Sequence, residues 1–227
     1  MWKHLALETL SVQSILIDLP GHGKSIGISD TSPSIEAMAI KVKEVIDHLK
    51  LELYHVIGHS MGGYIALELK AFDLGCQKIT LLNSNYWTDS LQRKKDRLRV
   101  AEIVFKAKDF FLSEAIPRLF SDTKKYKKEI LILINEASKI LPKDMAYCSI
   151  AMGNRKDFTS FVIENKADIY IIHGALDHLV NISDFEPVFL SDDTHFYLFP
   201  KSGHMCHVEC KNTTFLTTLM SPHVQQT

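Results

Sequence analysis

Short apolar runs alternate with segments of helical periodicity in the first third of the chain. Residues 14–19, 54–57 and 78–83 are apolar runs bounded by turn signals, which predicts buried strands. Residues 35–49 and 64–72 repeat their apolar positions with the period of a helix. The order strand, helix, strand, helix, strand predicts a parallel sheet with helices on both faces.

The middle of the chain breaks this alternation. No comparable strand pattern occurs from residue 87 to about residue 161, where the pattern predicts helices over residues 90–108, 109–120, 124–140 and 142–153. Apolar runs then return at residues 169–172 and 195–199, and a weak helical pattern covers residues 215–220. We therefore expect an α/β core split by a helical lid: residues 1–86 and 166–227 form the core, and residues 87–165 form the lid.

Composition narrows the class of protein. The chain has 227 residues, of which 46% are hydrophobic and 23% are charged, as in globular proteins that bury a core. The net charge of −1 shows no basic excess for binding nucleic acid. The apolar runs are too short to span a bilayer, and the first residues lack the apolar stretch of a signal peptide. We expect a cytoplasmic protein that acts on a small molecule.

The four cysteines are too few to build a disulfide fold at this length and are expected to be free thiols. The segment from His204 to Cys210, which also contains Cys206 and His207, resembles a metal-binding sequence at first sight. Its spacing fits no paired zinc pattern, and no second Cys/His cluster answers it. We expect neither a metal nor an organic cofactor.

Ser60 lies in a Gly-x-Ser-x-Gly motif between a predicted strand and a predicted helix. In this context the chain turns so sharply that the serine takes strained dihedral angles, and the residues two positions away, Gly58 and Gly62, must be small. The hydroxyl is then held at a helix N-terminus, which favours a developing negative charge. The motif predicts a catalytic nucleophile rather than a structural turn with an idle serine.

A serine nucleophile needs a base, and the base needs an acid that orients it. Asp177 follows the predicted strand at residues 169–172, and His204 follows the one at residues 195–199. Both positions are at the carboxyl ends of strands, where sites in open parallel sheets form. We expect Asp177 to be the acid and His204 to be the base.

Three other residues are weaker candidates for these roles. His207 is an alternative base, but it lies deeper in the predicted helix that follows. Asp184 is an alternative acid that is less well placed than Asp177. Asp168 precedes its strand and is therefore expected at the wrong end of the sheet.

Four separated motifs resemble the α/β-hydrolase family. Residues 18–25, Asp-Leu-Pro-Gly-His-Gly-Lys-Ser, resemble the turn after the family's fourth strand. Ser60, Asp177 and His204 match the family's nucleophile, acid and base in chain order. The helical block falls where the family inserts its lid. The resemblance covers nearly the whole chain, and it is strongest to small bacterial carboxylesterase-like hydrolases and menaquinone-pathway lyases.

This resemblance implies a serine hydrolase that cleaves a small carboxylic ester through an acyl-enzyme intermediate. A C–C hydrolase or lyase of the same fold and a catalytically impaired binding protein are the alternatives. The family pattern also implies that the backbone N–H of Met61 stabilises the oxyanion. Trp87, next to Tyr86, is expected to line the acyl pocket, although aromatic residues at such a place are as often part of the core.

Charge is unevenly distributed along the chain. Residues 92–128 hold 12 basic and 5 acidic residues, a net charge of +7, which leaves −8 on the rest. A solvated helical face explains this segment. The alternative is a basic rim that attracts an acidic ester substrate.

The sequence departs from the family pattern at its start. The family's first three strands, and the His-Gly loop that supplies the second oxyanion donor, have no counterpart, and residues 1–5 resemble the helix after that loop. The missing third strand would lie between the strands of residues 14–19 and 54–57, and its loss would leave backbone groups unpaired. We therefore expect that Met1 is an internal methionine of a longer protein. The alternative is that this chain has lost half of its oxyanion hole.

Overall fold

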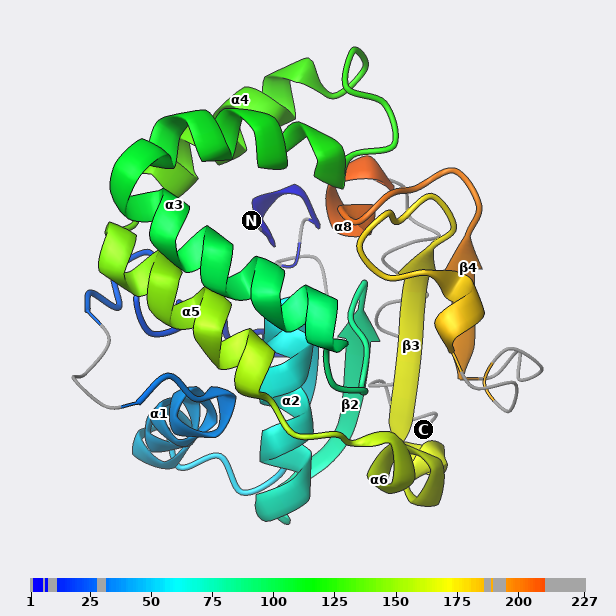
Figure 1. The fold of residues 1–227 in the computed structure, drawn as a ribbon. Helices are drawn as coiled ribbons and strands as arrows, with labels where there is room; N and C mark the ends of the chain where they lie inside the picture. The colour runs from blue at the N-terminus through cyan, green and yellow to red at the C-terminus, as the bar shows by residue number, and fades with distance from the viewer. Residues whose placement is uncertain are drawn as a thin grey trace.

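A four-stranded parallel sheet forms the centre of the computed structural model, which describes residues 2–5, 7, 12–27, 32–185, 189 and 195–210 (Figure 1). The described strands lie in the order β1 (Tyr54–His59), β2 (Cys76–Leu82), β3 (Ile169–Gly174) and β4 (Phe196–Phe199). Each neighbouring pair is parallel. The strands predicted around residues 54–57, 78–83, 169–172 and 195–199 are therefore confirmed.

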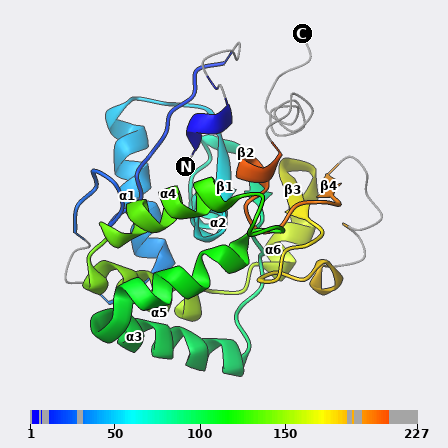
Figure 2. The ribbon, with the colours of Figure 1, turned by 90° about the horizontal axis from the view of Figure 1, so that it is seen from above.

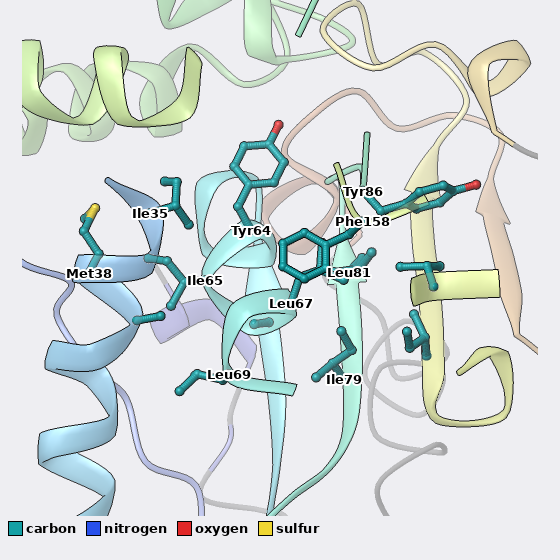
Figure 3. Packing of buried hydrophobic residues seen from close by; sticks show 14 of the residues in the cluster. Ile35, Met38, Tyr64, Ile65, Leu67, Leu69, Ile79, Leu81, Tyr86 and Phe158 are labelled. Carbon is teal, nitrogen blue, oxygen red and sulfur yellow. The ribbon is translucent and has the colours of Figure 1, made fainter. Parts of the chain in front are cut away.

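Two layers of helix cover the sheet. The helices that pack on it include α1 (Ile35–His48), α2 (Met61–Phe72), the short α8 (Cys206–Glu209) and the 3-10 helix η1 (Trp2–Leu5). Two further 3-10 helices, η4 (Lys166–Asp168) and η5 (Ile182–Asp184), precede and follow β3 along the chain. Leu81 of β2 packs in the cluster that contains α1 and α2 (Figure 3). The next residue, Leu82, packs with Leu5 of η1 and Cys206 of α8. Because successive side chains of a strand point to opposite faces, α2 and α8 lie on opposite faces of the sheet.

A helical insertion separates β2 from β3. It comprises α3 (Leu91–Ala115), α4 (Lys127–Ser138), α5 (Pro142–Asn154) and α6 (Thr159–Glu164), with the 3-10 helix η3 (Pro117–Leu119) between α3 and α4. The break predicted between residues 108 and 109 corresponds to a kink at Ala107, whose φ of −150° and ψ of 48° are not helical. Helices α3 and α5 lie side by side in both views (Figures 1 and 2). We call residues 87–165 the helical insertion.

The strand predicted over residues 14–19 is wrong. Residues 13–19 have no regular secondary structure, and Ile15 and Leu16 are 40% and 59% exposed. A cavity of about 750 Å³ lies between this segment and β1, with apolar side chains of α1 and α2 on its walls. An apolar composition indicates that a segment tends to be buried, but a strand also needs a neighbouring strand to which it can hydrogen-bond. Within the described part of the chain, this segment has none.

The turn after this segment forms as predicted. Gly21 and Gly23 take positive φ angles of 78° and 53°, and the Asp18 carboxylate accepts a hydrogen bond from the Lys24 N–H at 2.9 Å. The weak helix predicted at residues 215–220 lies outside the described residues. No helix in the described ranges is long and apolar enough to cross a membrane.

Candidate active site

Ser60 occupies the sharp turn between β1 and α2. Its φ of 51° and ψ of −119° lie in a region that side-chain-bearing residues rarely adopt. Three hydrogen bonds hold this conformation: the Ser60 N–H donates to Leu82 O at 3.0 Å, and the Ser60 carbonyl accepts from the Gly63 N–H and the Ser84 hydroxyl at 2.9 and 2.8 Å. The turn that the motif predicts is therefore present, with the serine at its apex.

The small residues that this turn requires differ partly from those that the motif predicts. A Cβ on Gly58 would lie 2.2 Å from the Gly62 carbonyl oxygen, and one on Gly63 would lie 2.3 Å from the Ser84 hydroxyl oxygen. A Cβ on Gly62 would have no heavy atom within 4 Å. Close packing of the turn therefore needs glycine at positions 58 and 63, whereas the backbone leaves room for a methyl group at position 62.

The structure brings Ser60, His204 and Asp177 into one hydrogen-bonded chain. His204 Nε2 is 2.9 Å from Ser60 Oγ, and His204 Nδ1 is 2.8 Å from Asp177 Oδ2. The carboxylate can only accept, so Nδ1 carries the proton and Nε2 is free to accept one from the serine hydroxyl. Asp177 and His204 are 5% and 4% exposed, which keeps both hydrogen bonds out of bulk water.

The environment of Asp177 keeps its carboxyl group ionised. Burial raises its pKa, but the hydrogen bond and charge of His204 and the N–H of Leu179 lower it further, so that the pKa of Asp177 is about 2. Its second oxygen accepts from the Leu179 N–H at 2.8 Å and the Val180 N–H at 3.3 Å. A fixed negative charge therefore faces His204 Nδ1 at neutral pH.

Two further buried residues hold the candidate acid and the candidate base, and the sequence patterns did not point to them. Asn83 has a positive φ of 45°, and its Nδ2 donates to Asp177 Oδ2 and to the Gly203 carbonyl, both at 3.1 Å. His59 Nε2–H donates to the His204 carbonyl at 2.8 Å. Burial lowers the pKa of His59 to about 3, so this ring stays neutral.

The weaker candidates lie elsewhere. The His207 ring packs against His59 and Trp2, with ring centroids 4.5 and 5.0 Å apart. Asp168 pairs with Lys70 at 2.9 Å before β3 begins, and Asp184 is exposed. The histidine that contacts Ser60 Oγ is His204.

Met61 and Trp87 differ in their relation to this centre. Met61 is the first residue of α2, so its N–H has no acceptor within the helix and is available next to Ser60. Trp87 packs edge-on against Tyr86 and Phe185, with centroids 5.0 and 5.1 Å apart. These contacts place Trp87 in an aromatic cluster beside the core, and its contact with an acyl group stays a prediction.

Among the described residues, no group of three or more His, Cys, Asp or Glu side chains is arranged to hold a metal ion. Cys206 and Cys210, which drew attention in the sequence, are both free thiols.

Comparison with known proteins gives concordant matches. Residues 2–119 match the family model described as alpha/beta hydrolase fold. The chain is 25% identical to a thermophilic esterase from Thermogutta terrifontis, solved with malate bound, with a TM-score of 0.85 over 98% of this chain and 85% of that one.

The chain is also similar to two curated proteins. The dihydrolipoyllysine-residue acetyltransferase component of the acetoin cleaving system of Pseudomonas putida is 23% identical over 92% of this chain. The 2-succinyl-6-hydroxy-2,4-cyclohexadiene-1-carboxylate synthase of Yersinia enterocolitica is 29% identical over 42% of it. The alignments span 55% and 35% of these relatives' own lengths.

Proposed function

Because this chain belongs to the α/β-hydrolase fold family, we propose that it hydrolyses a small carboxylic ester with Ser60 as nucleophile, His204 as base and Asp177 as the acid that orients the base. The hydrogen-bonded chain from Ser60 Oγ through the His204 ring to Asp177 carries this proposal. The esterase from Thermogutta terrifontis, which matches nearly the whole chain, supports an ester as the substrate class.

The reaction follows from the positions of these three side chains. Ser60 Oγ attacks the ester carbonyl carbon while its proton moves to His204 Nε2. When the tetrahedral intermediate collapses, the alkoxide takes that proton and leaves as the alcohol, and the acyl group stays on Ser60. A water molecule then gives a proton to His204 Nε2 and attacks the acyl carbon, which forms a second tetrahedral intermediate. As this intermediate collapses, the bond between the acyl carbon and Ser60 Oγ breaks, Ser60 Oγ takes the proton back from His204, and the acid leaves. Asp177 stabilises the imidazolium that forms in both halves of the reaction.

Negative charge develops on the carbonyl oxygen in each tetrahedral intermediate. The N–H of Met61, at the start of α2, is the donor that the turn offers to this oxygen. The partial positive charge of the helix N-terminus adds to its effect. One such donor contributes about 2.7–4 kcal/mol to transition-state stabilisation in serine hydrolases.

In this proposal the helical insertion is the lid, and residues 87–165 are its extent. Its basic segment, with a net charge of +7 over residues 92–128, favours an ester that carries a carboxylate. The synthase from Yersinia enterocolitica favours a second candidate, a lyase or C–C hydrolase that uses the same three residues. Turnover of simple esters distinguishes hydrolysis of esters from this alternative.

The test compares Ser60→Ala, His204→Ala and the double variant with p-nitrophenyl acetate. We expect each single change to lower kcat by about 10³–10⁶, and the double variant to be no worse, because the residues act as a unit. A fluorophosphonate probe should label Ser60 and no other serine. If His204→Ala keeps its activity while His207→Ala loses it, the base is misassigned. If the wild-type chain neither hydrolyses esters nor takes up the probe, the proposed function is wrong.

A further inference from the structure

The helical insertion touches the loop that carries His204 through backbone atoms. The His204 N–H donates to the Leu119 carbonyl at 2.9 Å. A Cβ on Gly203 would lie 2.9 Å from both Leu119 O and Ser121 N, so only glycine allows the two segments to come this close. The position of residues 119–121 and the position of the candidate base are therefore set together.

Glu209, at the end of α8, joins the same two segments with its side chain. Its Oε1 accepts hydrogen bonds from the Ser121 N–H and the Ser121 hydroxyl, both at 2.7 Å. Its Oε2 accepts from the Gly203 N–H at 2.5 Å. Hydrogen bonds to a carboxylate are about twice as strong as those between neutral groups. One half-buried carboxylate thus fixes a residue of the insertion and the residue before His204.

Apolar contacts reinforce this junction. Met205, which precedes α8, and Val208, within α8, pack in one buried cluster with Phe120 of the insertion. Tyr126 directly precedes α4, and its hydroxyl donates a hydrogen bond to the Glu209 carbonyl at 3.3 Å. The insertion therefore rests on α8 through a packed surface, and Glu209 supplies its charged hydrogen bonds.

We propose that Glu209 is a positioning residue, which locks the insertion segment 119–121 to the loop of His204 so that proton transfer depends on a seated insertion. This inference rests on the proposed function of Ser60 and His204. Asp177 fixes the direction of the imidazole ring, while Glu209 fixes the backbone from which that ring projects. If the insertion moves away from α8, the Gly203–His204 backbone loses its hydrogen bonds to Leu119 and Glu209, and His204 Nε2 moves away from Ser60 Oγ.

The direct test is Glu209→Gln, which keeps the size of the side chain and removes its charge. An amide has a single acceptor oxygen, so its NH2 group would face the N–H of either Ser121 or Gly203. A misplacement of about 1 Å at a reacting group costs about 10²-fold in rate. We expect kcat with p-nitrophenyl acetate to fall about 10- to 100-fold, with KM changed less than about threefold. Ser60 labelling by a small fluorophosphonate should slow by the same factor.

Glu114→Gln is the matched control. Glu114 lies near the end of α3 in the same insertion and forms an exposed ion pair with Arg118 at 3.7 Å. The same chemical change there should leave kcat, KM and labelling unchanged, since exposed pairs contribute little. Amide hydrogen exchange adds a readout that needs no substrate. Exchange should accelerate at residues 119–121 and 203–204 in Glu209→Gln and stay unchanged in β1.

The outcomes separate this inference from the function on which it rests. If the wild-type chain is inactive and unlabelled, the proposed function fails. If the wild type is active and Glu209→Gln matches it in kcat and labelling, the positioning role is refuted. A fall in activity that appears only as a raised KM assigns Glu209 to substrate binding and also refutes it. If Glu209→Gln does not fold, Ser121→Ala removes one of the three hydrogen bonds, and it should lower kcat and labelling together by a smaller factor.

Discussion

Replacing Gly58 by alanine should break the turn that presents Ser60. Position 58 lies inside β1, and a Cβ there would be 2.2 Å from the Gly62 carbonyl oxygen and 2.6 Å from the Gly63 nitrogen. Ordinary contacts of a Cβ begin at about 3.4 Å. Both contacted atoms are backbone at the start of α2, so no side chain can rotate away. The strand and the helix must separate by about 1 Å.

This separation should lower both the stability of the fold and the rate of acylation. Forcing a methyl group into a packed region costs about 1–3 kcal/mol of unfolding free energy. Gly→Ala otherwise adds about 0.4–1 kcal/mol to stability, where the backbone allows it, by restricting the unfolded chain. Because α2 carries the Met61 N–H and β1 leads into Ser60, a shift of about 1 Å between them should also lower the rate of acylation by about 10²-fold.

Gly62→Ala is the matched control within the same motif. A Cβ at position 62 meets no heavy atom within 4 Å, and the residue lies in the first turn of α2. Alanine is the better helix former by about 1 kcal/mol, so the control should be as stable as the wild type or more stable. Urea unfolding gives the free energies, and the rate of fluorophosphonate labelling reports the reactivity of Ser60.

The reasoning would be refuted if Gly58→Ala and Gly62→Ala had equal unfolding free energies and equal labelling rates. It would also fail if Gly62→Ala were the more damaging change. Either result would mean that the motif requires glycine for a reason other than the approach of the two backbones.

Two further predictions concern buried ionisable side chains. The pKa of His59 is about 3 in the folded chain and near 6.5 when unfolded, so its contribution to stability is present above pH 6.5 and is lost as the pH falls. Urea unfolding should show that the wild type loses about 2 kcal/mol more than His59→Gln between pH 7 and pH 5, and equal losses would contradict the buried neutral ring. Arg155 pairs with Asp89 at 2.8 Å, and both side chains are at least nine-tenths buried, so Arg155→Met should cost about 3–5 kcal/mol of unfolding free energy by leaving a buried carboxylate with one partner fewer. The exposed pair of Arg99 and Asp96 is the control, and Arg99→Met should cost less than about 1 kcal/mol; a similar loss in both variants would refute the role of burial.

The strands that the sequence predicted correctly are those with neighbours on the sheet. Strand β3 is almost entirely buried, so every one of its positions favours an apolar residue, and its pattern is readable without knowing its partner. Residues 14–19 have the same kind of composition, yet the segment forms no strand. Local composition records the tendency to be buried, while pairing depends on a segment elsewhere in the chain.

The candidate nucleophile, acid and base could be predicted for a similar reason. Ser60, Asp177 and His204 each follow a predicted strand, and the carboxyl ends of parallel strands meet at one edge of a sheet. Their proximity therefore needs only the direction of the strands and no knowledge of the loops between them. The helical insertion could be placed along the chain, and the break expected between residues 108 and 109 lies close to the kink at Ala107.

The residues that hold the three together could not be found in this way, because their partners are set by register. Leu82 pairs with Ile172, so the next residue, Asn83, donates its N–H to the Ile172 carbonyl and comes to lie beside the loop that begins after β3. A shift of one residue would turn the Asn83 side chain to the other face of the sheet, away from Asp177. An isolated Asn at the end of a strand carries no sign of this in the sequence, since the helical insertion separates it from β3. The hydrogen bond from Asn83 to Asp177 is thus a consequence of sheet register, as the hydrogen bond from His204 to Asp177 is a consequence of strand direction.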